Sequence, residues 1–335
     1  MSNIYKALQE RILVLDGAMG TMLQAYKFSE SDFRGDRFKE HSIPLKGNND
    51  LLSITQPQAI KEVHLTYLEA GADIIETNTF SGTTIAMADY EMEDLVYELN
   101  FESAKLAREA ADYYTQKTPE KPRFVAGSIG PTNKTASMSP DVNDPGFRAV
   151  TFEELKVAYK LQSEALLDGG SDILLVETVF DTLNAKAALF AIEEIKNERQ
   201  IEIPVMVSGT ITDASGRTLS GQTAEAFLIS ISHVPLLSVG FNCALGANLL
   251  QPHLEAIASK TNFAVSAHPN AGLPNAFGAY DETPEDMVAQ IESYFKKNLI
   301  NIIGGCCGTT PDHIKAIALK ASEFKPRPLK IHAHV

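Results

Sequence analysis

Eight short apolar runs, separated by segments with helical periodicity, are the feature that most limits how this chain can fold. Each run is rich in β-branched residues, nearly continuously apolar, and followed by Gly, Thr, Asn or Ser, as expected for strands buried on both faces of a parallel sheet. The runs cover residues 12–17, 72–79, 123–128, 171–178, 203–210, 236–243, 262–270 and 300–307. Strand–helix alternation repeated eight times predicts an α/β fold, the (β/α)8 or TIM barrel.

The segments between the runs are predicted to be helices. Ile60, Val63 and Tyr67 share one helix face, and Pro57 and Gly71 stand where a helix would begin and end. Further helices are expected near residues 104–114, 155–165, 183–196, 222–231, 246–258 and 284–296. A doubly wound open sheet is the alternative fold. The first run, however, is followed by DGAMG, whose glycines are too closely spaced for a GxGxxG dinucleotide motif.

One domain is expected over residues 1–322, because no linker-like stretch or break in composition interrupts them. Residues 323–335, EFKPRPLKIHAHV, are rich in Pro and Lys and are interpreted as a linker-like tail. Two connections that leave strand ends, 20–57 and 129–151, are long and are expected to be structureless lids or binding loops.

Charge and hydropathy exclude several classes of partner. The chain has 43 acidic against 29 basic residues, a net charge of −14, which argues against binding to nucleic acid or to anionic membranes. No apolar run approaches the roughly 20 residues that a membrane-spanning helix needs. The N-terminus lacks the apolar block of a signal peptide. We therefore expect a cytoplasmic protein with no nucleic-acid or membrane partner.

Three cysteines, Cys243, Cys306 and Cys307, stand at the ends of the sixth and eighth runs. In a closed barrel only one strand separates these two, and active sites lie at the C-terminal mouth of the strands. The glycines of GGCCG (304–308) would let the backbone turn both adjacent sulfurs inward. Three thiolates on Zn²⁺ leave one position open, as in catalytic zinc sites. We therefore predict a zinc site there that binds a substrate thiol as thiolate for attack on an electrophilic carbon.

Other interpretations of the cysteines remain open from the residues alone. Cys243 could be a small buried apolar residue, and Cys306 and Cys307 could form a redox-active disulfide. Gly304 and Gly305 could belong to a phosphate site of the kind that many barrels build near the last two strands.

Polar side chains at the other strand ends are expected to line the same mouth. Asn270 is the last residue of the seventh run, which lies between the two runs that carry cysteines. Its amide oxygen is a candidate fourth zinc ligand before substrate binds. The remaining polar residues of this ring are Asp16, Glu76, Thr77, Asn78, Ser128, Glu177, Thr178, Thr210 and Asn242.

At GFNC (240–243) and GGCCG (304–308) the sequence resembles the homocysteine S-methyltransferase family of zinc barrels. Within that family it is most similar to the N-terminal homocysteine-binding module of cobalamin-dependent methionine synthases. The resemblance extends over about residues 10–320. It includes LDGAMGTMLQ (15–24), LKGNNDLL (45–52), GADIIETNTF (71–80), TTIAMADY (83–90), GPTNKTASMSPDVNDP (130–145), LVETVFDTLNAKAA (175–188), SGTITDASGRTLSGQT (208–223) and AHPNAGLPNAFG (267–278).

The resemblance implies roles for individual residues. The zinc thiolates of the family fall on Cys243, Cys306 and Cys307. Its amino-acid site falls on Asp16, Gly17, Thr77 and Glu177. Asp16 and Glu177 would bind the ammonium group of homocysteine, and backbone N–H groups near Gly17 and Thr77 would bind its carboxylate.

The implied reaction is zinc-dependent methyl transfer from methylcobalamin to L-homocysteine, which gives L-methionine and belongs to methionine biosynthesis. The D-x-H-x-x-G motif of a cobalamin ligand is absent; PDHIKA (311–316) lacks the glycine. Methylcobalamin is therefore expected on another cobalamin-binding domain or subunit, working with a folate-binding domain or subunit. Alternatives are a stand-alone enzyme that uses S-methylmethionine or betaine, and a non-catalytic zinc- or thiol-binding module.

Overall fold

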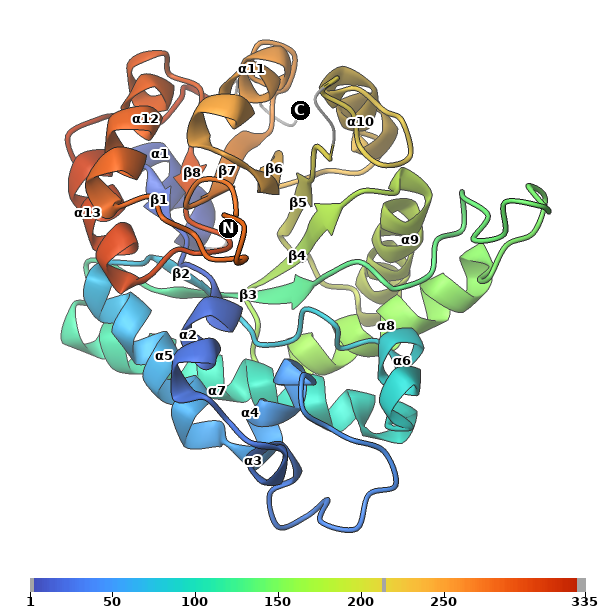
Figure 1. Cartoon of the computed structure of the whole chain (residues 1–335). Helices are drawn as coiled ribbons and strands as arrows, with labels where there is room; N and C mark the ends of the chain where they lie inside the picture. Colours follow the sequence, from blue (N-terminus) through green and yellow to red (C-terminus); the bar gives the residue numbers. More distant parts are fainter. Residues whose placement is uncertain (1–2, 213–214, 330–335) are drawn as a thin grey trace.

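Eight parallel strands form a nearly closed barrel in a computed structural model of the chain, which describes residues 3–212 and 215–329 (Figure 1). The strands are β1 (Leu13–Val14), β2 (Ile74–Glu76), β3 (Phe124–Ile129), β4 (Ile173–Val179), β5 (Val205–Gly209), β6 (Ser238–Gly246), β7 (Ala264–Asn270) and β8 (Ile302–Ile303). Their order in the sheet follows the order in the chain, with β8 beside β1. A bridge between Leu15 and Ile74 joins β1 to β2. The predicted TIM barrel is confirmed.

Helices surround the barrel, one after each strand (Figure 1). They are α5 (Pro57–Ala70), α7 (Val96–Lys117), α8 (Phe152–Asp168), α9 (Thr182–Arg199), α10 (Ala224–Ile231), α11 (Ala247–Ala258), α12 (Pro284–Lys296) and α13 (Pro311–Ala321). Helix α1 (Asn3–Glu10) precedes the first strand. Short helices α6 (Thr84–Met87), η2 (Ala88–Tyr90) and η3 (Glu93–Leu95) precede α7.

Two apolar layers explain why the strands are apolar at successive positions. Alternate strand residues, including Leu13, Phe124 and Met206, fill the barrel interior, where Ile4 and Leu8 of α1 pack with them. The intervening residues face outward and pack against the helices; they include Val14, Ile75, Val125, Leu174, Val207, Val239, Val265 and Ile303. Both faces of each strand are therefore buried, as the sequence predicts.

The connection 20–57 contains helices, so the expectation of a structureless segment is wrong there. It holds most of α2 (Met19–Tyr26), then α3 (Glu30–Arg34), η1 (Asn49–Leu51) and α4 (Leu52–Thr55). The sequence carries the physical reason, because Ser29 N–H donates to Asp32 Oδ2 (2.7 Å) in a capping box at the start of α3. Phe33 and Leu45 bury their side chains in an apolar cluster with α5 and α7.

The connection 129–151 contains no helix or strand beyond the end of β3, as predicted. Its first part is bound to the start of α9, where Ala136 N–H donates to Asn184 Oδ1 (3.0 Å) and Ser137 Oγ donates to Asp181 Oδ2 (2.5 Å). Its tip is exposed, with Val142 at 91%. The loop extends outward beyond α8 and α9 (Figure 1).

Part of the predicted tail is packed against the barrel. The Arg327 guanidinium donates to the carbonyl oxygens of Ala258 (2.7 Å) and Thr261 (2.6 Å), at the end of α11. Phe324 stacks on Phe295 of α12 with ring centroids 5.2 Å apart. Residues 330–335 of the predicted linker-like tail lie outside the described residues. Among the described helices, none has the length and apolar character needed to cross a membrane.

Candidate active site

The three cysteines meet at the C-terminal mouth of the barrel, as predicted. Their Sγ atoms all lie within 4.8 Å of one another, and those of Cys243 and Cys307 are 3.7 Å apart. All three are unpaired and partly buried, so the structure contains no disulfide between Cys306 and Cys307. Two thiolates bonded tetrahedrally to zinc at about 2.3 Å would stand about 3.8 Å apart. The observed sulfur separation therefore fits a thiolate-bound metal ion.

Irregular backbone at two strand ends brings the sulfurs together. The β6–β7 register shifts between Asn242 and Gly246, and Cys243 has a left-handed φ of 60°. Strand β8 ends at Ile303, before the GGCCG segment, as the glycines predict. Cys306 N–H then donates to the Pro269 carbonyl oxygen (2.9 Å), which fixes the segment beside β7. The sequence does not predict the left-handed conformation of Cys243, because residues other than glycine rarely adopt it.

Asn270, at the end of β7, lies in the strand between the two that bring the cysteines. Its side chain is 1% exposed, and its Oδ1 atom accepts no hydrogen bond from any described residue. Buried carbonyl oxygens are nearly always paired. An unpaired amide oxygen in this position is therefore suited to serve as a ligand for a cation.

Three carboxyl groups, those of Asp16, Glu76 and Glu177, form a second cluster at the mouth. Asp16 and Glu177 are 2% and 6% exposed. Glu76 N–H donates to Asp16 Oδ2 (3.1 Å), and Ser128 Oγ donates to Glu177 Oε1. Asp16 Oδ1 is buried and accepts no hydrogen bond from a described residue. The cluster is therefore suited to receive a cationic group.

Burial raises the pKa of each of these carboxyl groups. Burial, opposed by the hydrogen bond from Ser128 and helped by the negative charge of Cys307, raises the pKa of Glu177 to about 7. Burial followed by repulsion from Glu177 raises the pKa of Glu76 well above its ordinary value. Burial does the same for Asp16. An ammonium ion placed among them would favour their ionised forms.

Gly17 and Thr77 stand at the ends of β1 and β2, next to the carboxyl cluster. A Cβ atom on Gly17 would lie 2.7 Å from Thr309 Oγ1 and 2.9 Å from the Tyr67 hydroxyl, so no larger residue fits. Thr77 N–H donates to the Ala126 carbonyl oxygen (3.0 Å), within the β2–β3 pairing. Thr77 Oγ1 accepts from Ser128 N–H (2.9 Å). Thr77 therefore shapes the mouth through its contacts with β3.

The sequence analysis did not single out Tyr280 or Asp50, both of which lie beside the mouth. Tyr280 hydrogen-bonds to Cys307 and packs on Gly308, where an added Cβ would lie 2.3 Å from Tyr280 Cβ. Hydrogen bonds from Cys243 and Cys306 lower the pKa of the Cys307 thiol, and the bond from Tyr280 contributes. Burial raises the pKa of Asp50 to about 7. Tyr280 lies in a loop and Asp50 in the short helix η1, so neither stands at a strand end where the sequence would indicate it.

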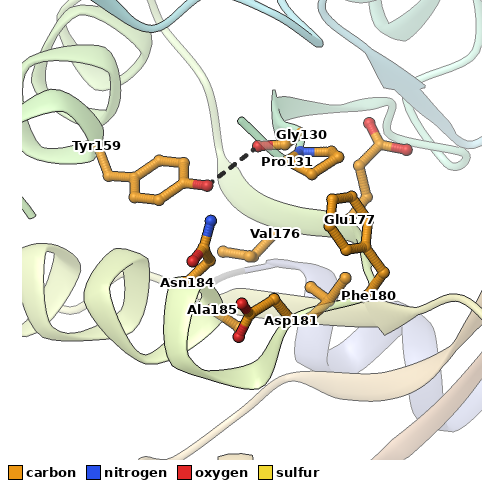
Figure 2. Close-up of a pocket in the computed structure, with 10 residues that line it drawn as sticks. Gly130, Pro131, Tyr159, Val176, Glu177, Phe180, Asp181, Asn184 and Ala185 are labelled. Carbon is orange, nitrogen blue, oxygen red and sulfur yellow. Dashed lines mark hydrogen bonds between the residues drawn. The ribbon is translucent and has the colours of Figure 1, made fainter. Parts of the chain in front are cut away.

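A separate pocket lies behind the end of β4, on the helix side (Figure 2). Gly130, Tyr159, Asp181 and Asn184 line it, and Tyr159 Oη donates to the Gly130 carbonyl oxygen (3.5 Å). The Glu177 carboxyl group points away from Tyr159 and Asn184 in this view (Figure 2). None of the three cysteines lines the pocket. Glu177, which belongs to the carboxyl cluster, also lines this pocket.

Solved structures of other proteins have the same fold. The homocysteine methyltransferase MmuM from Escherichia coli, in its oxidised form, has 24% identity and a TM-score of 0.71, with 92% of this chain and 96% of that chain covered. Its metallated form has 24% identity and a TM-score of 0.70, with 95% of this chain and 99% of that chain covered. A B12-independent methionine synthase from Shewanella sp. W3-18-1, in complex with selenomethionine, has 12% identity and a TM-score of 0.51, with 94% of this chain and 97% of that chain covered. These similarities support the fold alone.

The assignment to a family comes from the sequence. Residues 13–321 match the model of the family described as Homocysteine S-methyltransferase. The match includes every strand of the barrel, both cysteine-bearing segments and the carboxyl cluster. This chain therefore belongs to the homocysteine S-methyltransferase family, whose reaction is methyl transfer to homocysteine.

Proposed function

We propose that this chain activates L-homocysteine as a thiolate at a zinc ion held by Cys243, Cys306 and Cys307, for methyl transfer from methylcobalamin that yields L-methionine. The observation that carries the proposal is the convergence of three thiol sulfurs within 4.8 Å at the mouth of the barrel. Three sulfur ligands suit a catalytic zinc site, which keeps one position for substrate. The unpaired cysteines also suit a reducing compartment, the cytoplasm.

The residues at the metal end have distinct tasks. Zinc bound there would supply a position at which the substrate thiol is held as a thiolate at neutral pH. Cys243, Cys306 and Cys307 supply the sulfur donors, and the unpaired Oδ1 of Asn270 supplies a fourth ligand before homocysteine binds. Three thiolates donate much negative charge, so the substrate sulfur would remain electron-rich and nucleophilic.

The residues at the amino-acid end orient the substrate. Asp16 and Glu177 bind the ammonium group of homocysteine through charge-assisted hydrogen bonds, and Glu76 adds negative charge beside them. Backbone N–H groups near Gly17 and Thr77 bind the carboxylate; the N–H of Gly17 itself donates to no described residue. Fixing both charged groups directs the sulfur towards the cysteines. The subsequent reaction then resembles an intramolecular one.

Methylcobalamin as donor requires a cobalamin-binding domain or subunit, and its remethylation requires a folate-binding one. The resemblance to cobalamin-dependent methionine synthases in motifs that surround the cysteines supports this donor. A stand-alone reaction with S-methylmethionine or betaine is the alternative. We expect the chain to form methionine from homocysteine with free methylcobalamin and not with either small donor. Turnover with a small donor and none with methylcobalamin would contradict the proposed donor but leave the homocysteine site intact.

X-ray absorption at the zinc edge tests the thiolate site. We expect three sulfurs and one oxygen or nitrogen ligand without substrate, and four sulfurs after homocysteine is added. A ligand set unchanged by homocysteine would instead support a non-catalytic zinc-binding module.

A further inference from the structure

Asn242, on β6, makes four hydrogen bonds through one buried carboxamide. The residue is 1% exposed. Its Oδ1 accepts from Ser208 Oγ (2.7 Å) and from the backbone N–H of Thr178 (3.0 Å). Its Nδ2 donates to Thr178 Oγ1 (2.8 Å) and to Cys306 Sγ (3.9 Å). Both ends of the carboxamide are therefore fully engaged, and its orientation is fixed.

The partners of Asn242 belong to the two halves of the site. Cys306 is part of the sulfur cluster, and Cys243 follows Asn242 directly in the chain. Thr178 follows Glu177, which belongs to the carboxyl cluster. Glu177 and Cys243 come from strands that are not adjacent in the sheet, because β5 lies between β4 and β6. Asn242 bridges this gap with a single side chain.

Asn242 also contacts both places where the strand backbone becomes irregular. Thr178 has a φ of 53°, a left-handed conformation that a β-branched residue rarely adopts. The β4–β5 register shifts beside it, between Val176 and Val179. The β6–β7 register shift begins at Asn242 itself. The hydrogen bonds to Thr178 hold its peptide and its hydroxyl in this conformation, which sets the direction in which the neighbouring Glu177 side chain leaves the strand.

We propose that Asn242 is a positioning residue that fixes the distance between the metal-binding and amino-acid-binding halves of the site. This inference rests on the proposed function, because it treats Cys306 as a zinc ligand and Glu177 as a ligand of the substrate ammonium. The side chain donates to a metal-bound thiolate and, with the same planar group, holds the backbone beside Glu177. A substrate that must reach both ends with one short chain requires this separation to be constant.

The carboxamide is suited to this task because it combines a donor and an acceptor on one rigid plane. Aspartate has the same shape but would place a negatively charged oxygen against the thiolate of Cys306 while keeping an acceptor for Thr178 N–H. Alanine removes both sets of contacts. The two substitutions therefore separate the sulfur contact from the backbone contact.

The experiment measures zinc affinity and ligand affinity in the full chain carrying Asn242→Asp or Asn242→Ala. We expect Asn242→Asp to weaken zinc binding by about 10- to 100-fold, as loss of a hydrogen bond to a metal ligand does. Binding of L-2-aminobutyrate, which has the amino-acid groups but no thiol, is expected to change little. Asn242→Ala is expected to weaken both zinc binding and L-2-aminobutyrate binding. The absorption spectrum of the cobalt-substituted protein should shift in both variants, because the sulfur–metal bonds change.

Asn301→Ala is the matched control. Asn301 is fully buried, accepts from Val265 N–H (3.0 Å) and donates to the Arg327 carbonyl oxygen (2.7 Å), away from the cysteines. This variant is expected to lose thermal stability but to retain the cobalt spectrum. If the Asn242 variants fail to fold, Ser208→Ala removes one of the four hydrogen bonds and is expected to weaken zinc and homocysteine binding together by a few-fold.

The outcomes distinguish this inference from the proposed function. Wild-type protein that binds neither zinc nor homocysteine contradicts the proposed function. Wild-type protein that binds both, with folded Asn242 variants or Ser208→Ala unchanged in zinc affinity, ligand affinity and cobalt spectrum, overturns the inference alone.

Discussion

The sulfur atoms of Cys243 and Cys307 lie 3.7 Å apart, although 64 positions separate the two residues in the chain. The barrel produces this proximity because β6 and β8 both flank β7. The left-handed backbone of Cys243 and the turn after β8 complete it. The cluster therefore depends on the closed sheet as well as on the cysteines.

Cys306→Ala is expected to abolish zinc retention and methyl transfer together, because two thiolates and a neutral amide bind zinc much more weakly than three thiolates do. Metal analysis of the purified protein and a methionine-formation assay measure the two effects. Circular dichroism confirms that the variant is folded. Methyl transfer that persists in a folded Cys306→Ala variant would refute the role of Cys306 as a ligand.

Asn270→Ala is expected to remove a protein ligand from the substrate-free site and to leave the homocysteine-bound site unchanged. The reason is that the substrate sulfur would take the position that Oδ1 occupies before binding. Zinc affinity with and without saturating homocysteine measures the difference. Asn270→Asp, which keeps an oxygen at this position, is the control. Equal losses of zinc affinity with and without homocysteine would speak against a ligand that the substrate displaces.

Glu177→Gln is expected to weaken homocysteine binding by roughly 10- to 100-fold. A hydrogen bond to a charged group contributes about 1.5–3 kcal/mol, and the uncharged amide cannot pair with the ammonium as strongly. Isothermal titration calorimetry on the zinc-loaded protein measures this loss. Zinc stoichiometry should stay the same, since the hydrogen bond of the Glu177 carboxyl group is to Ser128 and Glu177 is not one of the proposed zinc ligands. Unchanged affinity would remove Glu177 from the amino-acid site.

The stability of the metal-free protein is expected to depend on the protonation of Glu177. Its pKa in the folded protein, about 7, lies above its ordinary value, so the folded state binds more protons between these values than the unfolded state does. The stability that protonated Glu177 contributes is therefore fully present below the unfolded pKa and is lost as the pH rises through about 7. Urea unfolding of wild type and Glu177→Gln from about pH 5 to about pH 8 tests this. The free energy of unfolding of Glu177→Gln relative to that of wild type should rise with pH. A difference that does not change with pH would contradict the raised pKa of Glu177.

Gly240→Ala is expected to destabilise the barrel by at least about 3 kcal/mol, because overpacking against backbone cannot be relieved by a side-chain rotation. The added Cβ would lie 1.8 Å from the Ser266 carbonyl oxygen in β7. Gly20→Ala is the control, since no atom lies within 4 Å of its added Cβ. Thermal unfolding compares the two. Equal melting temperatures for the variants would show that β6 and β7 can separate without cost.

The strands and their order follow from the sequence because every strand is buried on both faces and is therefore continuously apolar. Helix ends were equally readable: α5 begins at Pro57 and ends before Gly71, whose φ is 112°. The prediction for the connection 20–57 is wrong because its helices are short and are stabilised by tertiary burial of residues such as Phe33. Local periodicity over so few residues is weak.

The convergence of the cysteines was predictable because strand ends meet at one mouth, whereas the distances within the site were not. Glu76 stood in the predicted ring of strand-end residues, but only the structure shows that it lies against Asp16. Tyr280 comes from a loop, so no strand position indicates its contact with Cys307. The positive φ angles of Thr178 and Cys243 arise from register shifts between strands, which a single sequence does not specify.

Strands β1 and β8 have only two residues each, and they lie side by side in the sheet. Strand β8 pairs with β1 and with β7 at two positions each, so few ladder hydrogen bonds hold the strand that leads into Cys306 and Cys307. A metal ion that joins the Cys306–Cys307 segment to Cys243 of β6 would act as a crosslink across β7 and would reinforce the attachment of this short strand. Removal of the ion by a chelator would then destabilise the barrel as well as abolish the zinc-dependent activity. The loss of stability and the loss of activity would follow the same zinc-binding curve.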